Sequence, residues 1–249
     1  MYNLAHDFIV PILKEKNVFS PGMSVCEIGC AEGGVLAAFV EDGAKDALGT
    51  DIATDRLETG KAINKEIGIS FEFSEHNILS DNIDSRYISK YDLVILRDVL
   101  EHLEDTKSAL SAIKRILKPG GRLYVTFPPY YSPYGGHQHT LVSTIGKLPF
   151  LHFLPTKIFY KLIKNGRKAD VAEVMRLKQI RLTPRKFYRI CKELGLSIIM
   201  EQYYFIRPVY KMKFRLPIVS SNAVRFLPFV KSVLSTEAGF VLEKPKNEK

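Results

Sequence analysis

The stretch Val25-Cys26-Glu27-Ile28-Gly29-Cys30-Ala31-Glu32-Gly33-Gly34 decides the fold of this chain. An apolar run enters it, and apolar residues continue beyond it at helical spacing as far as Val40. This pattern predicts a strand, a tight glycine turn and a helix. Glycines let a ligand approach the backbone, and the first turn of a helix offers unpaired N–H groups. We therefore expect a site for a nucleotide-like cofactor at this turn.

An acid follows the next apolar run. Ala47–Ile52 predicts a second strand, and Asp51 near its end lies 18 residues after Gly33. A carboxylate in this position can accept hydrogen bonds from both hydroxyls of a ribose. The run Gly29-x-Ala31-x-x-Gly34 is also a degenerate match to the fingerprint of nicotinamide dinucleotide sites. These two features leave open which nucleotide cofactor binds.

The segments that follow Asp51 narrow the choice of cofactor. Tyr91–Asp98 predicts a strand, Val99–Leu117 a helix, and Arg122–Phe127 the next strand. The succession resembles the class I S-adenosylmethionine-dependent methyltransferases over roughly residues 20–130. The resemblance rests on Glu27-x-Gly29-x-Ala31-x-Gly33, Asp51, Leu100-Glu101-His102, and Lys118-Pro119-Gly120-Gly121 before a strand.

The resemblance implies an α/β fold. We expect a Rossmann-like, mostly parallel seven-stranded sheet whose last strand is antiparallel and lies beside its predecessor, with helices on both faces. Residues 1–249 then form one domain, and residues 2–17 form an amphipathic helix beside the cofactor. Two long segments, 128–180 and 207–236, interrupt this scheme, and we expect both to build a lid over the substrate.

The resemblance also implies a cofactor, S-adenosylmethionine, with S-adenosylhomocysteine as product. Ala31 stands where the family usually has glycine, and an alanine fits there if its φ is negative. The implied contacts are Glu27 and Arg97 near the methionine part, the backbone of Gly29, Cys30, Ala31 and Gly33, Asp51 on the ribose, Ile52 and Asn77 at the adenine, and His102 facing the methyl donor.

The loop after the fifth predicted strand, Tyr130–His139, is the best candidate for the acceptor site, because open α/β sheets bind ligands at this edge. Methylation of an oxygen requires removal of its proton, and His137 and His139 are the predicted general bases. Tyr130, Tyr131 and Tyr134 could stack on a sugar or ring. Alternatively, the histidines only order the loop. We expect no metal here, because no acid lies near the two histidines in the sequence.

Asp98 and Glu101 also have a purely structural interpretation. Their spacing at the start of the predicted helix is typical of a capping box, in which Asp98 is the N-cap and Glu101 the third helical residue. We favour this interpretation, which gives the two acids no part in chemistry.

Composition limits the class of protein. The chain has 249 residues, 46% of them hydrophobic, and three cysteines without a metal-ligand pattern. It has neither a run of about 18 apolar residues nor a secretion signal, so we expect a cytoplasmic protein. Residues 151–249 carry 21 of the 36 Lys and Arg but 7 of the 27 acids, so the basic surface belongs to the C-terminal part.

A basic surface attracts anionic partners. Aromatic residues and cations mix in Leu148–Lys164 and in Lys211–Lys231, which suits either peripheral contact with anionic lipid or a lid packed on its own domain. A solvated basic face without a partner is a further alternative. We expect no nucleic acid as partner, since no binding module is visible and Phe127-Pro128-Pro129-Tyr130 lacks the acid or amide that begins the signature of amino-methylating enzymes.

The sequence therefore predicts O-methylation of a small-molecule, sugar or lipid-linked acceptor. Two alternatives remain: an NAD-dependent oxidoreductase, and a non-catalytic methyltransferase-like module that binds at a membrane surface.

Overall fold

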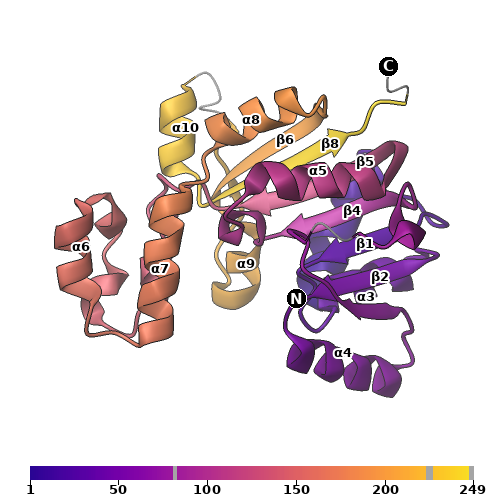
Figure 1. Ribbon diagram of the computed structural model, residues 1–249, viewed down its shortest axis with the longest axis horizontal. Coiled ribbons are helices and arrows are strands. Elements are labelled where there is room, and N and C mark those ends of the chain that lie inside the picture. The colour runs from indigo at the N-terminus through magenta and orange to yellow at the C-terminus, as the bar shows by residue number, and fades with distance from the viewer. Residues whose placement is uncertain (81–82, 223–226, 247–249) are drawn as a thin grey trace.

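One mixed sheet forms the centre of the computed structural model, which describes residues 1–80, 83–222 and 227–246 (Figure 1). The strand order is β3-β2-β1-β4-β5-β8-β6-β7, with parallel pairing from β3 to β5 and antiparallel pairing of β8 with both β5 and β6. The strands are β1 (Val25–Ile28), β2 (Ala47–Asp51), β3 (Glu72–Glu75), β4 (Tyr91–Arg97), β5 (Leu117–Phe127), β6 (Ser197–Ile206), β7 (Val219–Ser220) and β8 (Glu237–Glu243).

The predicted fold class and the insertion of the last strand are confirmed. The sheet has an eighth strand, because β7 pairs antiparallel with β6 at the edge. Both residues of β7 are exposed, so this strand carries no apolar alternation that the sequence could have revealed.

Helices cover both faces of the sheet. An N-terminal helix runs from Tyr2 to Glu15 as α1 (Tyr2–Leu4), a π-helical turn (Ala5–Ile9) and α2 (Val10–Glu15). It packs with α3 on one face, and α5 and α8 pack on the other (Figure 1). The remaining bounds are α3 (Gly34–Glu41), α4 (Thr54–Ile67), α5 (Thr106–Ile116), α6 (Thr156–Ile163), α7 (Lys168–Ile180), α8 (Pro184–Glu193), α9 (Pro208–Phe214) and α10 (Pro228–Leu234).

The central strand β4 joins two hydrophobic cores. Successive side chains of a strand point to opposite faces. Accordingly, Leu93 and Ile95 pack with the N-terminal helix and α3, whereas Val94 and Leu96 pack with α5 and α8. All four are fully buried, which fixes the register of β4 and with it the position of the loop that follows.

The segment 128–180 is folded rather than irregular. It contains α6, α7 and three 3₁₀ turns, η4 (Gln138–Thr140), η5 (Thr144–Lys147) and η6 (Leu151–Phe153). These elements stand at one side of the sheet, at the left of Figure 1. The segment has its own apolar cluster, formed by Leu141, Leu151, Phe159, Ile163, Val171 and Val174. We call this segment the side lobe.

The predicted helix 99–117 is interrupted. A 3₁₀ turn, η3 (Leu100–His102), comes first, and α5 begins only after Asp105, whose side chain accepts a hydrogen bond from the Ser108 N–H. The capping-box interpretation of Asp98 and Glu101 was therefore wrong: Asp105 is the N-cap. Asp98 instead has a left-handed backbone with φ 54°.

No helix among the described residues is long and apolar enough to cross a membrane. The three cysteines are free and buried, as expected of packing residues. Part of the second aromatic and basic segment, residues 223–226, lies outside the described residues.

Candidate active site

The turn between β1 and α3 places three residues in the left-handed region, with φ of 71° at Gly29, 53° at Ala31 and 75° at Gly33. Ala31 does not have the negative φ that we expected an alanine to need. This backbone costs an L-residue about 1–2 kcal/mol. A Cβ on Gly33 would lie 2.7 Å from the Phe71 ring and 2.8 Å from the Phe73 ring, so packing within the protein requires this glycine.

Asp51 holds the turn in place. One carboxylate oxygen accepts the Ala31 N–H at 2.8 Å, and the other accepts the Ala53 N–H at 2.9 Å. The first of these bonds offsets the backbone strain at Ala31. A carboxylate has about four acceptor positions, so Asp51 keeps capacity for two further donors on the side that faces solvent.

Glu27 is a buried acid at the end of β1. Its carboxylate accepts the Leu36 N–H at 3.0 Å, at the first turn of α3. Burial raises the pKa of Glu27 to about 8, although the Leu36 hydrogen bond and the charge of Arg97 act in the opposite direction.

A cleft of about 890 Å³ opens at the carboxyl ends of β1, β2 and β4. It contains every predicted cofactor residue except Gly33. Asn77 lies there with its amide oxygen accepting the Leu79 N–H at 3.0 Å, and Ile52 is 69% exposed. The lining includes Glu27, Gly29, Cys30, Ala31, Asp51, Ile52, Asn77, Arg97 and His102.

Tyr2 of the N-terminal helix and the preceding Met1 line the cleft, where the sequence predicted a helix beside the cofactor. Two further lining residues had no signal in the sequence: Arg56 comes from α4 and Arg176 from the side lobe. These elements are far apart in the chain, and only the sheet topology brings them to the same edge.

A second cavity, of about 290 Å³, adjoins this cleft. The two share Met1, Arg97 and Asp98 as lining residues. The second cavity contains the predicted residues His137, His139 and Tyr134, and also Arg207, Tyr210 and Lys213 from the other inserted segment. Both inserted segments thus contribute to its wall.

Two of the predicted acceptor contacts lie elsewhere. Tyr130 is buried, and its ring packs edge-on against His152, whose Nε2 lies 2.7 Å from the Tyr130 carbonyl oxygen. Tyr131 packs against Tyr130 and Phe153. Among the described residues, the linings of these two cavities include neither tyrosine. Their placement supports a role in ordering the side lobe.

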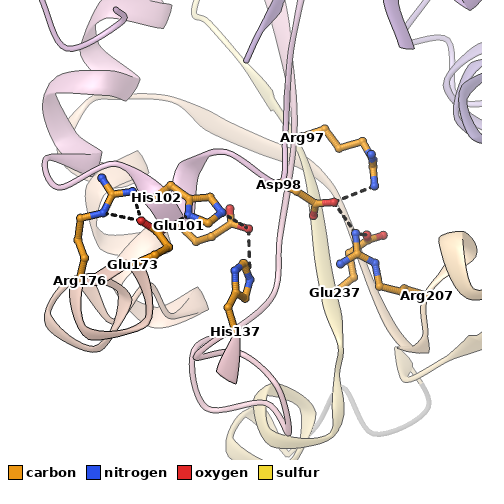
Figure 2. A network of polar contacts seen from close by, with 9 residues as sticks. All are labelled: Arg97, Asp98, Glu101, His102, His137, Glu173, Arg176, Arg207 and Glu237. Atoms are coloured by element: carbon orange, nitrogen blue, oxygen red, sulfur yellow. Dashed lines mark hydrogen bonds and ion pairs between the residues drawn. The ribbon is translucent and has the colours of Figure 1, made fainter. Parts of the chain in front are cut away.

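A charged network closes the base of the second cavity (Figure 2). Asp98 accepts hydrogen bonds from Arg97 at 2.8 Å and from Arg207 at 2.5 Å, and Arg207 also pairs with Glu237 at 2.8 Å. Burial alone would raise the pKa of Asp98, but the two guanidinium groups hold it below its usual value. The network ties β4, β8 and the segment that follows β6.

Beside it lies a second polar group, made of Glu101 and His102 from η3 and His137 from the side lobe (Figure 2). Burial raises the pKa of Glu101 well above its usual value, and the nearby charge of Asp98 adds to this. Burial lowers the pKa of His137 to about 3, helped by His102 and His139. Burial also lowers the pKa of His139, with Lys147 adding to the effect.

Comparisons with known proteins agree with this architecture. The family model described as "Methyltransferase domain" matches residues 3–200. The ubiquinone biosynthesis O-methyltransferase of Photorhabdus laumondii is 29% identical over 103 residues, which is 41% of this chain and 42% of that protein. The enzyme of the same name from Burkholderia thailandensis is 24% identical over 189 residues, 75% of this chain and 78% of that protein. The match thus spans about two fifths of the length of the first of these relatives.

Solved structures show the same fold. An S-adenosylmethionine-dependent methyltransferase from Clostridium acetobutylicum superposes with a TM-score of 0.61 at 13% identity, covering 98% of this chain and 92% of that one. A protein described as a putative sarcosine dimethylglycine methyltransferase from Galdieria sulphuraria gives a TM-score of 0.63 at 13% identity, covering 97% and 85%.

Proposed function

The chain belongs to the class I S-adenosylmethionine-dependent methyltransferase family, and on this premise we propose that it methylates a hydroxyl oxygen of a small-molecule, sugar or lipid-linked acceptor. One observation carries the proposal: the two cavities meet at Arg97 and Asp98. Methyl transfer requires the donor and the nucleophile to be held in line and nearly in contact. Two adjoining cavities, one for each reactant, meet this requirement.

The larger cleft fits S-adenosylmethionine. Its volume lies within the roughly 300–1,000 Å³ that is usual for small-ligand sites. The remaining acceptor positions of Asp51 suit two ribose hydroxyls, the exposed Ile52 suits the adenine face, and Glu27 and Arg97 suit the methionine end. When bound, the cofactor supplies an electrophilic methyl group. The chain's own residues bind it, orient it and hold the acceptor beside it.

The smaller cavity suits an acceptor hydroxyl. The rings of Tyr134 and Tyr210 offer flat surfaces to a polar ring, and Lys213 offers a donor. His137 and His139 stand on its wall, and an imidazole nitrogen can take a proton from a hydroxyl group. The name O-methyltransferase of the curated relatives supports oxygen as the acceptor atom. Neither the oxidoreductase nor the non-catalytic alternative gains support.

We also propose that a lipid-linked acceptor is reached at a membrane surface through α6. Its exposed residues combine apolar side chains with cations: Ile158 is 51% and Tyr160 50% exposed, Lys157 precedes Ile158, and Lys161 follows Tyr160. Apolar residues flanked by lysines suit an interface with anionic lipid. Cosedimentation with phosphatidylcholine vesicles should require added phosphatidylserine and should weaken in Ile158→Glu. Equal binding to vesicles with and without phosphatidylserine would contradict the proposed contact with anionic lipid.

The first experiment is calorimetric titration with S-adenosylmethionine and S-adenosylhomocysteine. We expect binding by the wild type and a loss of tenfold or more in Asp51→Asn, because an amide cannot accept at both of its termini. Asp55→Asn is the matched control, an exposed acid outside the cleft. A folded wild type that binds neither compound would overturn the proposal. Binding would justify a screen of hydroxylated acceptors by mass spectrometry.

A further inference from the structure

Three possible metal ligands converge where the two cavities meet. The ligand atoms of Glu101, His102 and His137 lie within 4.8 Å of one another. Glu101 Oε1 lies 3.8 Å from Nε2 of His102 and 3.9 Å from Nε2 of His137. These distances are too long for hydrogen bonds. Glu101 and His137 face the smaller cavity and His102 the larger cleft.

Glu101 lacks the partners that a buried carboxyl group normally has. Its side chain is nine-tenths or more buried, with 3% of the residue exposed, and neither carboxylate oxygen has a hydrogen-bond partner among the described residues. Buried carboxylates are usually paired, protonated or bound to a metal. The guanidinium groups nearby do not pair with it, because Arg97 and Arg207 engage Asp98 and Glu237.

His102 is held with one nitrogen toward Glu101. Its other nitrogen, Nδ1, lies 2.6 Å from Glu173 Oε1, and Arg176 donates to Glu173 at 2.7 Å (Figure 2). A carboxylate behind a histidine is typical of metal-binding histidines, since it fixes the tautomer and points the free nitrogen at the ion. Glu173 and Arg176 belong to α7, so the side lobe supplies this support.

His137 is held on the opposite side. Its backbone is left-handed, with φ 55°, and its N–H donates to the Tyr134 carbonyl oxygen at 2.9 Å. A non-glycine residue in this region is uncommon and persists where the surroundings over-determine it. The loop thus directs the His137 ring toward η3, where its centroid lies 5.1 Å from that of His102.

We propose that Glu101, His102 and His137 bind a divalent transition-metal ion of the Zn²⁺ type. Two imidazoles and one carboxylate favour such ions over Mg²⁺ and Ca²⁺, which prefer oxygen ligands. Bonds of about 2.0–2.2 Å place neighbouring tetrahedral ligand atoms roughly 3.4 Å apart. The two separations from Glu101, 3.8 and 3.9 Å, and the limit of 4.8 Å on all three ligand atoms come down to that spacing through side-chain rotations. Three protein ligands leave a coordination position open toward the acceptor.

This ion deepens the proposed function and rests on it for its role. A Lewis acid beside the acceptor lowers the pKa of its hydroxyl group. In this arrangement His137 is a ligand rather than a base, and the proton of the acceptor hydroxyl leaves to solvent through the smaller cavity. The sequence alone favours no metal, because no acid lies near His137 and His139 along the chain. The acid comes from the preceding strand–helix loop.

The test is titration of chelator-treated protein with Co²⁺, followed by visible absorption, without any cofactor. We expect one saturable d–d spectrum that Zn²⁺ displaces. Glu101→Gln and His137→Gln should abolish it, while His139→Gln and the surface variant His6→Gln keep it. Circular dichroism confirms that each variant is folded. Glu173→Gln, which weakens the support of His102 and leaves all three ligands in place, should weaken Co²⁺ binding about 10–100-fold.

Two results would overturn the metal site: folded wild type that binds neither Co²⁺ nor Zn²⁺, or a spectrum that persists in Glu101→Gln and His137→Gln. Neither result bears on cofactor binding, which is measured separately with metal-free protein. A protein that binds S-adenosylmethionine but no metal would therefore retain the proposed function and lose only this inference.

Discussion

Arg207 is the guanidinium that the half-buried Asp98 and the buried Glu237 share, and replacing it should damage stability severely. In Arg207→Met, Asp98 loses a 2.5 Å contact and Glu237 a 2.8 Å contact, while the methionine keeps most of the apolar stem. Breaking a buried ion pair by removing one partner costs about 3–5 kcal/mol, because the remaining charge stays buried. This is a large share of the roughly 5–15 kcal/mol that stabilises a typical domain.

The stability lost in Arg207→Met should depend on Glu237 and on pH. In Arg207→Met/Glu237→Gln the orphaned charge of Glu237 is gone and Asp98 keeps its contact with Arg97, so we expect more than half of the lost stability to return. Without Arg207, burial raises the pKa of Glu237 in the folded state above its unfolded value, so the folded state binds the proton more tightly. The deficit of Arg207→Met should therefore shrink as pH falls from about 7 to about 5.

Urea unfolding monitored by circular dichroism measures the stability lost in Arg207→Met, the part that returns in the double variant, and the dependence of the loss on pH. Arg189→Met is the matched control, because Arg189 is exposed and pairs with Glu193 only at 3.9 Å. It should change stability by less than about 0.5 kcal/mol. A loss below about 1 kcal/mol in Arg207→Met, or strictly additive losses in the double variant, would refute the reasoning.

Three further outcomes are expected from the same measurement. Ala31→Gly should raise the unfolding free energy by about 0.5–1 kcal/mol, since relief of the left-handed strain exceeds the entropy that glycine costs; a loss would contradict the strain. Gly33→Ala should cost at least about 2 kcal/mol more than Gly68→Ala, because both have positive φ but only Gly33 meets rings within 3 Å; equal costs would exclude the overlap. Because its folded pKa is raised to about 8, Glu27 should make the wild type lose up to about 1.4 kcal/mol per unit as pH rises from about 4.5 to 8, and Glu27→Gln should remove that slope; an unchanged slope would place the titration elsewhere.

The cofactor half of the molecule could be predicted because its signals are local. Glu27, the glycine turn and Asp51 lie within two adjacent strand–turn units, and each strand shows its burial directly in sequence. The parallel order then follows from the alternation of strands and helices. Gly33 shows the limit of this reasoning. Its motif predicts a ligand contact, and the structure adds a second reason for glycine, since a Cβ there would overlap the rings of Phe71 and Phe73.

The region around Glu101 could not be predicted because its partners come from elsewhere. Asp98 and Glu101 have the three-residue spacing of a capping box, and a polar site can have the same spacing. The capping box is the commoner of the two, so the sequence pattern favours it. The residues that decide between them, His137, Glu173 and Arg207, belong to the two inserted segments. How closely these residues approach Asp98 and Glu101 depends on how the two segments pack. Neither hydrophobic periodicity nor secondary-structure propensity predicts that packing.

The separate apolar cluster of the side lobe has an evolutionary consequence. Replacing Leu141, Phe159 or Val174 should destabilise the side lobe alone, because the cores on the two faces of the sheet do not include these residues. The side lobe can therefore change its sequence as a unit, while the strands of the sheet keep theirs. New acceptor preferences can then arise without a new fold.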